Sequence, residues 1–173
     1  AATVTVFRDG KIINFTIKLT PHDRLVPVHI EGVPPSYYIC AGIVFTVVSV
    51  PYLRSEYGKD YDYDAPLRLL TKMMHEQKEE PDDQVVVVSQ VLSSDINTGY
   101  EDIVNVIVTG VNGKPVRNLK SLVKTVEQCK EEYLKIELNE SLSIVLNTKE
   151  VKKSTKDILD THCISSPRSV DLR

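Results

Sequence analysis

Residues 108–116 read Val-Thr-Gly-Val-Asn-Gly-Lys-Pro-Val, an apolar run that ends in an Asn-Gly pair. Asn-Gly favours a tight turn, because both residues tolerate the positive φ angles that such turns require. The next stretch carries apolar residues at helical spacing, and Asn118 stands where a helix cap is expected. This apolar stripe consists of Leu119, Leu122, Val123, Val126 and Cys129. The segment therefore predicts a strand, a turn and a helix with one buried face.

Further strands are predicted on both sides of this segment. Residues 1–19 alternate about Asp9-Gly10 and indicate a hairpin, and residues 133–146 indicate a second hairpin. The apolar runs 37–49, which Gly42 interrupts, and 84–92 are typical of buried strands. The central helix is therefore expected to pack among several strands.

Three other segments are expected to be helical or irregular. Residues 50–66 are polar and rich in tyrosine, and we expect an ordered surface loop there. A helix should follow with Pro66 in its first turn, and a final helix should begin after Asn147. Residues 165–173 are expected to form a loose tail. The buried face of the helix after the loop should consist of Leu67, Leu70 and Met74.

Composition narrows the classes of protein to which the chain can belong. Of its 173 residues, 42% are hydrophobic and 26% are charged, which is ordinary for a globular protein. The net charge of −3 argues against a nucleic-acid partner, since such proteins usually carry a basic face. No apolar run approaches the roughly 20 residues of a membrane span. We therefore expect a soluble protein with no nucleic-acid partner and no membrane span.

Motifs for catalysis and metal binding are missing from the sequence. It contains no Gly-x-Ser-x-Gly elbow, no His-Glu-x-x-His pair and no phosphate-binding loop. Asp60, Asp62 and Asp64 alternate like calcium ligands, but Ala65 and Thr71 stand where a calcium loop needs glycine and glutamate. We expect no catalytic residue, no metal and no cofactor in this chain.

One segment has the chemistry of a peptide-binding groove. Residues 41–45, Ala-Gly-Ile-Val-Phe, place a glycine between apolar residues just before a strand. Such a loop can direct backbone N–H groups at a peptide carboxylate or carbonyl, and the strand could accept an added strand beside the helix that Asn118 caps. The alternative is that Gly42 only permits a bulge in a core strand.

Taken together, these segments resemble the PDZ domains of Deg/HtrA serine proteases. The general resemblance rests on Val-Val-Val-Ser-Gln-Val-Leu at 86–92 and Val-Asn-Gly-Lys-Pro-Val-Arg-Asn-Leu at 111–119. Residues 21–173 are similar to the second PDZ domain of plant-type organellar Deg proteases, and residues 1–19 resemble the closing hairpin of the first. The more specific similarity rests on residues 35–45, 50–58, 95–101 and 158–164.

The resemblance implies a fold and a division of the chain. The fold would be of the α+β class and mainly β, a partly open barrel or sandwich with two to three capping helices and an extra C-terminal helix. Residues 1–20 would close a preceding PDZ domain. Residues 21–164 would form a PDZ-like domain with an inserted loop at 50–66, and residues 165–173 would be a loose tail.

The resemblance also implies a function. The whole protein would be an ATP-independent serine endopeptidase whose catalytic domain lies outside this chain, in a mitochondrion or chloroplast, or in the nucleus. This domain would mediate assembly with its own protease domain and other subunits. Alternatively, it would bind unfolded or C-terminal peptide segments. The groove would consist of Ala41, Gly42, Ile43, Val44, Phe45 and Thr46 with Leu119, Leu122, Val123 and Val126, and the assembly surface would contain Tyr52, Tyr57, Tyr61 and Tyr63.

Overall fold

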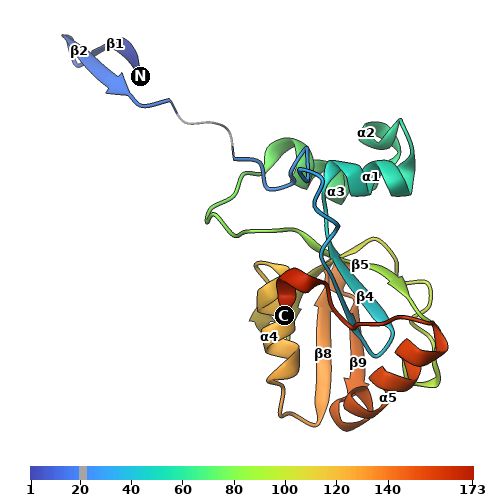
Figure 1. Cartoon of the computed structure of the whole chain (residues 1–173). Coiled ribbons are helices and arrows are strands. Elements are labelled where there is room, and N and C mark those ends of the chain that lie inside the picture. The colour runs from blue at the N-terminus through green and yellow to red at the C-terminus, as the bar shows by residue number, and fades with distance from the viewer. Residues whose placement is uncertain (20–22) are drawn as a thin grey trace.

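A seven-stranded antiparallel sheet forms the main body of the computed structural model, which describes residues 1–19 and 23–173 (Figure 1). Six strands follow the order β3-β4-β5-β6-β8-β9, and β7 pairs with β6. The sheet is open and the helices surround it, so the α+β, mainly β prediction is confirmed. The strands are β3 (Tyr37–Cys40), β4 (Ile43–Val47), β5 (Val86–Val91), β6 (Val106–Val111), β7 (Lys114–Pro115), β8 (Tyr133–Leu138) and β9 (Ser143–Asn147).

The turn between β6 and β7 forms as its sequence predicts. Asn112 and Gly113 have φ angles of 49° and 74°, in the left-handed region that an Asn-Gly pair tolerates. The Asn112 side chain also fixes the turn to β8: its Oδ1 accepts from the Lys135 N–H at 2.7 Å, and its Nδ2 donates to the Tyr133 carbonyl at 3.0 Å. The turn therefore sets the position at which the following helix begins.

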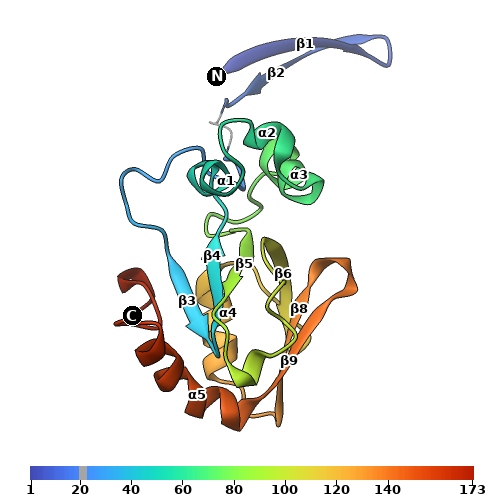
Figure 2. The same ribbon diagram turned by 90° about the vertical axis from the view of Figure 1, so that its right-hand side faces the viewer.

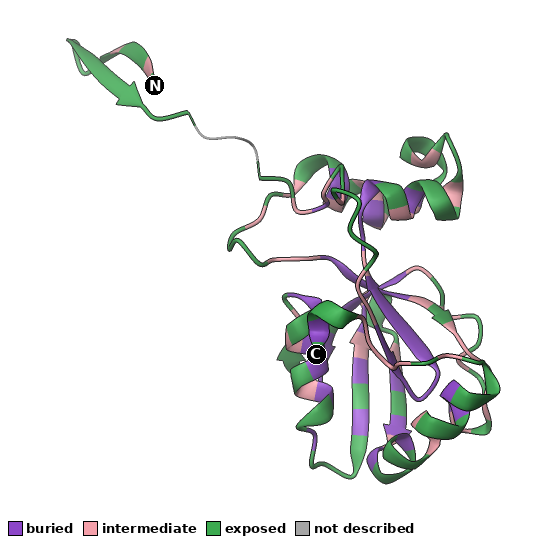
Figure 3. Ribbon diagram, in the orientation of Figure 1, coloured by how far each residue is buried: buried purple, intermediate pink, exposed green. Residues whose placement is uncertain are grey.

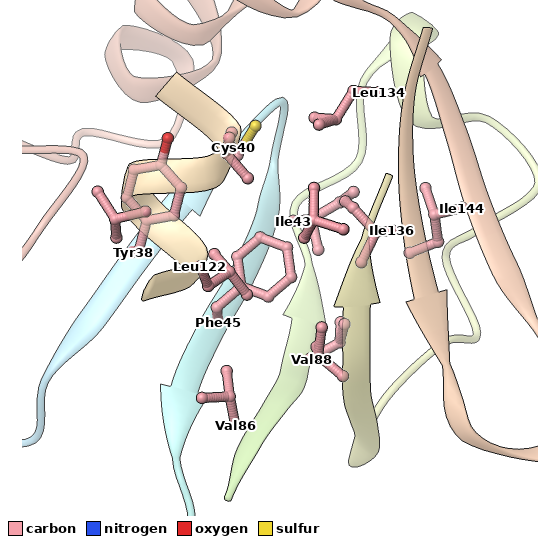
Figure 4. Packing of buried hydrophobic residues seen from close by; sticks show 14 of the residues in the cluster. Tyr38, Cys40, Ile43, Phe45, Val86, Val88, Leu122, Leu134, Ile136 and Ile144 are labelled. Carbon is pink, nitrogen blue, oxygen red and sulfur yellow. The ribbon is translucent and has the colours of Figure 1, made fainter. Parts of the chain in front are cut away.

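Helix α4 (Leu119–Glu127) buries its apolar stripe against the sheet. Asn118 caps it, because its Oδ1 accepts from the Ser121 N–H at 2.8 Å while the Ser121 hydroxyl accepts from the Asn118 N–H at 3.2 Å. Leu122 packs with Phe45 of β4 and with side chains from β5 and β8 (Figure 4). The predicted helix, its cap and its buried face are confirmed.

The segment 50–66 is not a loop. It forms α1 (Val50–Tyr57) and α2 (Tyr61–Asp64), joined through Gly58 at φ 75°. Ser49 caps α1 by accepting from the Tyr52 N–H at 3.2 Å. The polar composition of the segment did not predict these helices, because each short helix needs only a few apolar residues to face inward. In α1 these are Val50 and Leu53, and Ala65, directly after α2, is buried as well.

Helices α1 and α2 belong to a second hydrophobic core, which α3 (Leu67–His75) completes. The predicted buried face of α3 is wrong, since Leu67 is 79% exposed and Met74 is half exposed. Leu69 and Met73, one turn apart, point inward instead. The helix begins directly after Pro66, and its inward face packs in the same cluster as Val26.

Helix α5 (Thr148–Thr161) is the expected final helix. Asn147 caps it by accepting from the Lys149 N–H at 3.0 Å, and Val151, Ile158 and Leu159 are buried. Two short 3₁₀ turns, η1 (Asp95–Asn97) and η2 (Asn139–Ser141), connect neighbouring strands. In the described part of the chain, no helix has the length and apolar character needed to cross a membrane.

The segment after α5 is not a loose tail. It ends in the 3₁₀ turn η3 (Val170–Leu172), and Leu172 is only 9% exposed. Before that turn, the backbone runs beside β3 and exchanges hydrogen bonds with it (Figure 2). The sequence does not predict this docking, because the hydrogen bonds join backbone groups and need no recurring apolar pattern.

The predicted N-terminal hairpin forms from β1 (Ala2–Arg8) and β2 (Lys11–Ile17), with Asp9-Gly10 at the turn. Most of its residues are exposed (Figure 3). Residues 20–22, where the predicted first domain boundary falls, lie outside the described residues.

Candidate functional site

The loop between β3 and β4 is closed by a buried amide. Ala41 and Gly42 have φ angles of 50° and 83°. Asn97 of η1 is fully buried, and its Nδ2 donates to the carbonyls of Ala41 and Leu92, each at 2.8 Å. The Leu92 N–H donates to the Gly42 carbonyl at 2.7 Å. A Cβ on Gly42 would collide with both Asn97 and Leu92, so this position needs glycine for space as well as for its φ angle.

Strand β4 is paired along both of its edges. On one side Ile39 of β3 stands opposite Val44, and on the other Thr46 stands opposite Val87 of β5. Thr46 also donates its hydroxyl to the Ser36 carbonyl at 2.9 Å. The chain itself therefore occupies the position at which the sequence predicts an added peptide strand, along residues 44–46.

The predicted groove residues are buried, but they do not all lie in one core. Ile43 and Phe45 are fully buried, and Ala41, Val44 and Thr46 are buried as well. Ala41, Ile43 and Phe45 share the main core with the stripe of α4, which consists of Leu119, Leu122, Val123 and Val126, whereas Val44 belongs to a separate cluster with Ile39 and Leu159. The structure thus brings part of the two sets together as packed side chains, and their role in peptide binding stays a prediction.

An open cavity lies at the outer side of β3. Its volume is about 290 Å³, and β3, α4, α5 and the segment after α5 all contribute to its wall. The Arg168 guanidinium lies over the Tyr38 ring, 5.9 Å from the ring centroid, and forms an ion pair with Glu127 of α4. Burial raises the pKa of the Tyr38 hydroxyl well above its ordinary value of 10.0. This cavity combines an apolar floor with charged groups at its rim.

Three residues outside the predicted site support this region: Asn97 closes the loop, Arg168 lines the cavity and Leu172 is buried in the main core. Asn97 lies in segment 95–101, which the family resemblance covers without giving it a role. Arg168 and Leu172 lie in the expected loose tail. A single polar residue after a strand and a short irregular tail carry no periodic signal, so sequence patterns alone could not single them out.

The four tyrosines of the predicted assembly surface differ in exposure. Tyr63 is 87% exposed, whereas Tyr52, Tyr57 and Tyr61 are partly buried against the second core. Tyr52 donates its hydroxyl to Asn105, and burial raises the pKa of that hydroxyl. Tyr61 packs under the Arg54 guanidinium, 5.3 Å from the ring centroid. Three of the four therefore help to hold the helices, and Tyr63 is free to meet another molecule.

Comparison with known families decides what this architecture is. Residues 26–171 match the family described as the PDZ domain. The chain belongs to the PDZ domain family. The partly open, mainly β architecture with its surrounding helices is therefore a PDZ-like fold, as the sequence resemblance predicted. In this PDZ domain, helices α1 and α2 and the docked C-terminal segment up to residue 171 lie within the matched residues.

The curated relatives of this PDZ domain are Do-like proteases. The chain is 36% identical over 171 residues to protease Do-like 2, chloroplastic, and 38% identical over 166 residues to protease Do-like 4, mitochondrial, both of Arabidopsis thaliana. It is 37% identical over 172 residues to the putative protease Do-like 3, mitochondrial, of the same plant. The alignments cover 99%, 96% and 99% of this chain, but only 28%, 29% and 29% of those proteins.

The domain is thus similar to a part, less than one third in length, of Deg/HtrA-like proteases. The names of these relatives give the chloroplast or the mitochondrion as their compartment. They do not support the nucleus, which the sequence analysis kept as an option.

Proposed function

We propose that this PDZ domain is a non-catalytic module of an ATP-independent Deg/HtrA serine endopeptidase, and that it mediates subunit assembly and regulation of the protease. The observation that carries the proposal is the pairing of β4 on both edges, since a peptide receptor of this fold needs a free strand edge. The matched family and the Do-like relatives support the parent class. The catalytic residues would belong to a domain outside this chain.

The helical unit of α1, α2 and α3 is the proposed assembly surface. Tyr63 on α2 and Leu67 on α3 are among the most exposed large side chains of the domain. Aromatic residues are enriched at interfaces because they offer apolar area with a polar tip. Below these two side chains, the fully buried Leu53 and Leu69 hold the helices in place. A firmly packed unit that presents apolar groups outward suits contact with another subunit.

The N-terminal hairpin supports the proposed division into tandem domains. Val4 stands opposite Phe15, and Val6 stands opposite Ile13, so these four side chains share one face. The other face carries Thr5, whose hydroxyl donates to Asn14 at 2.7 Å, and the exposed pair Phe7 and Ile12 near the turn. A two-stranded hairpin is marginal by itself and gains stability by covering its apolar face. We propose that residues 1–20 complete a preceding PDZ domain, whose core would cover that face.

The partners in this proposal are the protease domain of the same chain and neighbouring subunits of a homo-oligomer. The proposed compartment is the mitochondrion or chloroplast, as in the named relatives. The second candidate function is a receptor for unfolded or C-terminal peptide segments. It would use the residues of β4 and α4 only if β3 left the edge of β4.

The test is the oligomeric state and the proteolytic rate of the parent protein after substitution of Tyr63→Asp and Leu67→Asp together. We expect the oligomer to dissociate at concentrations where the unchanged protein stays assembled, because two charges would enter a desolvated contact. Tyr133→Asp with Val145→Asp, at exposed positions of the β8–β9 hairpin, is the matched control. An unchanged oligomer in the first variant would refute the proposed surface.

A further inference from the structure

The outer edge of β3 is the end of the main sheet, and the C-terminal segment extends it. The Ile39 N–H donates to the Pro167 carbonyl at 2.7 Å, and the Ser169 N–H donates to the Tyr37 carbonyl at 3.0 Å. Tyr38 and Arg168 are antiparallel bridge partners. An edge strand presents unpaired N–H and C=O groups that can pair with an added segment. Residues 167–169 therefore lie on β3 in the way an added peptide strand would.

Side chains of the segment fix its position at two points. Arg168 reaches between the Tyr38 ring and the Glu127 carboxylate of α4. Four residues later, Leu172 enters the main core, and Asp171 accepts from the Ser36 hydroxyl at 2.7 Å. A cation and an aliphatic residue four positions apart thus give the segment its register. Without them, the backbone bonds alone would not distinguish one extended sequence from another.

The segment does not fill the space beside β3. A cavity of about 290 Å³ remains between Pro167, Arg168 and the helices α4 and α5. Val170 is exposed, and the ion pair of Arg168 with Glu127 lies in contact with solvent. Partly exposed ion pairs of this kind contribute little to stability. Apart from the buried Leu172, the docked segment therefore resembles a bound ligand more than a strand of the core.

We propose that the outer edge of β3 is a strand-addition site for extended peptides, and that residues 166–172 occupy it in cis as a displaceable ligand. The site takes an extended segment with a guanidinium group facing Tyr38 and Glu127 and an aliphatic residue four positions later. It differs from the groove that the sequence predicts along β4. The proposal stands on the β3 edge alone and does not depend on the assembly function.

The experiment measures binding of a labelled peptide with the sequence of residues 165–173, acetylated and amidated at its ends, by fluorescence anisotropy. A chain shortened to end at residue 164 should bind it saturably. The chain of residues 1–173 should bind it at least about tenfold more weakly, because a short tether holds the competing segment at an effective concentration of ~1 mM. The same peptide with Ser169→Pro lacks the N–H that Tyr37 accepts, and it should not bind.

Variants of the 173-residue chain make the test independent of the folding of the shortened chain. Ser169→Pro fits the φ of −66° at this position and removes both the backbone donor and the hydroxyl that accepts from the Tyr37 N–H at 3.1 Å, while Ser169→Ala removes the hydroxyl alone. The chain with Ser169→Pro should bind the unmodified peptide several-fold more tightly than the chain with Ser169→Ala. Equal weak binding by both variants would overturn the proposal, as would equal binding of the Pro-containing and unmodified peptides by the shortened chain.

Discussion

Tyr38 and Arg168 join the edge of the sheet to the C-terminal segment: they are bridge partners in the backbone, and the guanidinium lies 5.9 Å from the centroid of the tyrosine ring. Their contact connects β3, α4 and the end of the chain, since Arg168 also pairs with Glu127. The edge that the fold would otherwise leave open is thus covered from within the chain.

Replacing Arg168 with alanine should weaken the docking of the C-terminal segment. A cation–π contact and a partly exposed ion pair together are worth about 1 kcal/mol. We expect a loss of that size in urea denaturation and faster hydrogen exchange of the Ile39 amide, which donates to Pro167. Arg8→Ala, at an exposed position of the hairpin, is the control. If exchange at Ile39 stays unchanged, Arg168 does not hold the segment.

Replacing Asn97 with alanine should destabilise the domain strongly. The substitution leaves the carbonyls of Ala41 and Leu92 without their buried donor, at a cost of about 1–3 kcal/mol. Thr98→Ala is the matched control, because the Thr98 hydroxyl donates to the Asp95 carbonyl at an exposed position. Thermal and chemical unfolding should separate the two variants. Equal stability would mean that the loop at Gly42 does not depend on the amide.

Leucine-to-alanine substitutions on α1 and α3 should distinguish a buried position from an exposed one by their effect on stability. Leu53 is fully buried, so Leu53→Ala should cost about 2–5 kcal/mol. Leu67 is exposed, and Leu67→Ala should change stability by less than about 0.5 kcal/mol. Guanidinium denaturation of the two variants makes the comparison. A surface loop at 50–66 would instead tolerate both changes equally.

Stability should fall as the pH rises above about 9. Burial raises the pKa of the Cys40 thiol from its ordinary value of 9.0 to about 12. Between these values the unfolded thiol loses its proton while the folded one keeps it, so the unfolded state binds fewer protons and the free energy of unfolding decreases with pH. Burial raises the pKa of Tyr38 as well, which acts in the same direction at higher pH.

Denaturant unfolding between pH 8 and pH 10.5 tests this prediction. Cys40→Ala should lower the stability at pH 8, since it leaves a cavity, but it should flatten the decline with pH. Cys163→Ala is the control, because Cys163 is exposed. A decline of the same steepness in all three proteins would assign the pH dependence to other groups.

Local signals predicted the parts of the fold that depend on neighbours in sequence. The sequence predicts the stripe of α4, its cap at Asn118 and the turn at Asn112, because each requires specific residues at fixed spacing. The sequence predicts helix α3 in the right place but assigns the wrong face of it to the core. Its buried pair, Leu69 and Met73, was decided by contacts with the second core, which residue spacing alone does not reveal.

The candidate site was less predictable, because its decisive contacts are distant in sequence and made by the backbone. The apolar run 41–46 indicates a turn and a buried strand, and both form. It does not show that β3 pairs over its whole length with β4. Docking of residues 167–169 uses N–H and carbonyl groups that every sequence possesses. The two anchors, Arg168 and Leu172, are isolated residues without a recurring pattern.

The central claim is that the chain itself occupies both edges of β4 and the outer edge of β3. The most direct measurement is a map of backbone amide shifts by NMR while the 173-residue chain is titrated with a hydrophobic C-terminal peptide. We predict no saturable shifts at Val44 to Thr46, and we expect shifts at Tyr37 and Ile39 only when the peptide of residues 165–173 is added to the chain shortened to end at residue 164. Saturable shifts along β4 in the unchanged chain would contradict the account, because they would require β3 to yield its place to a peptide.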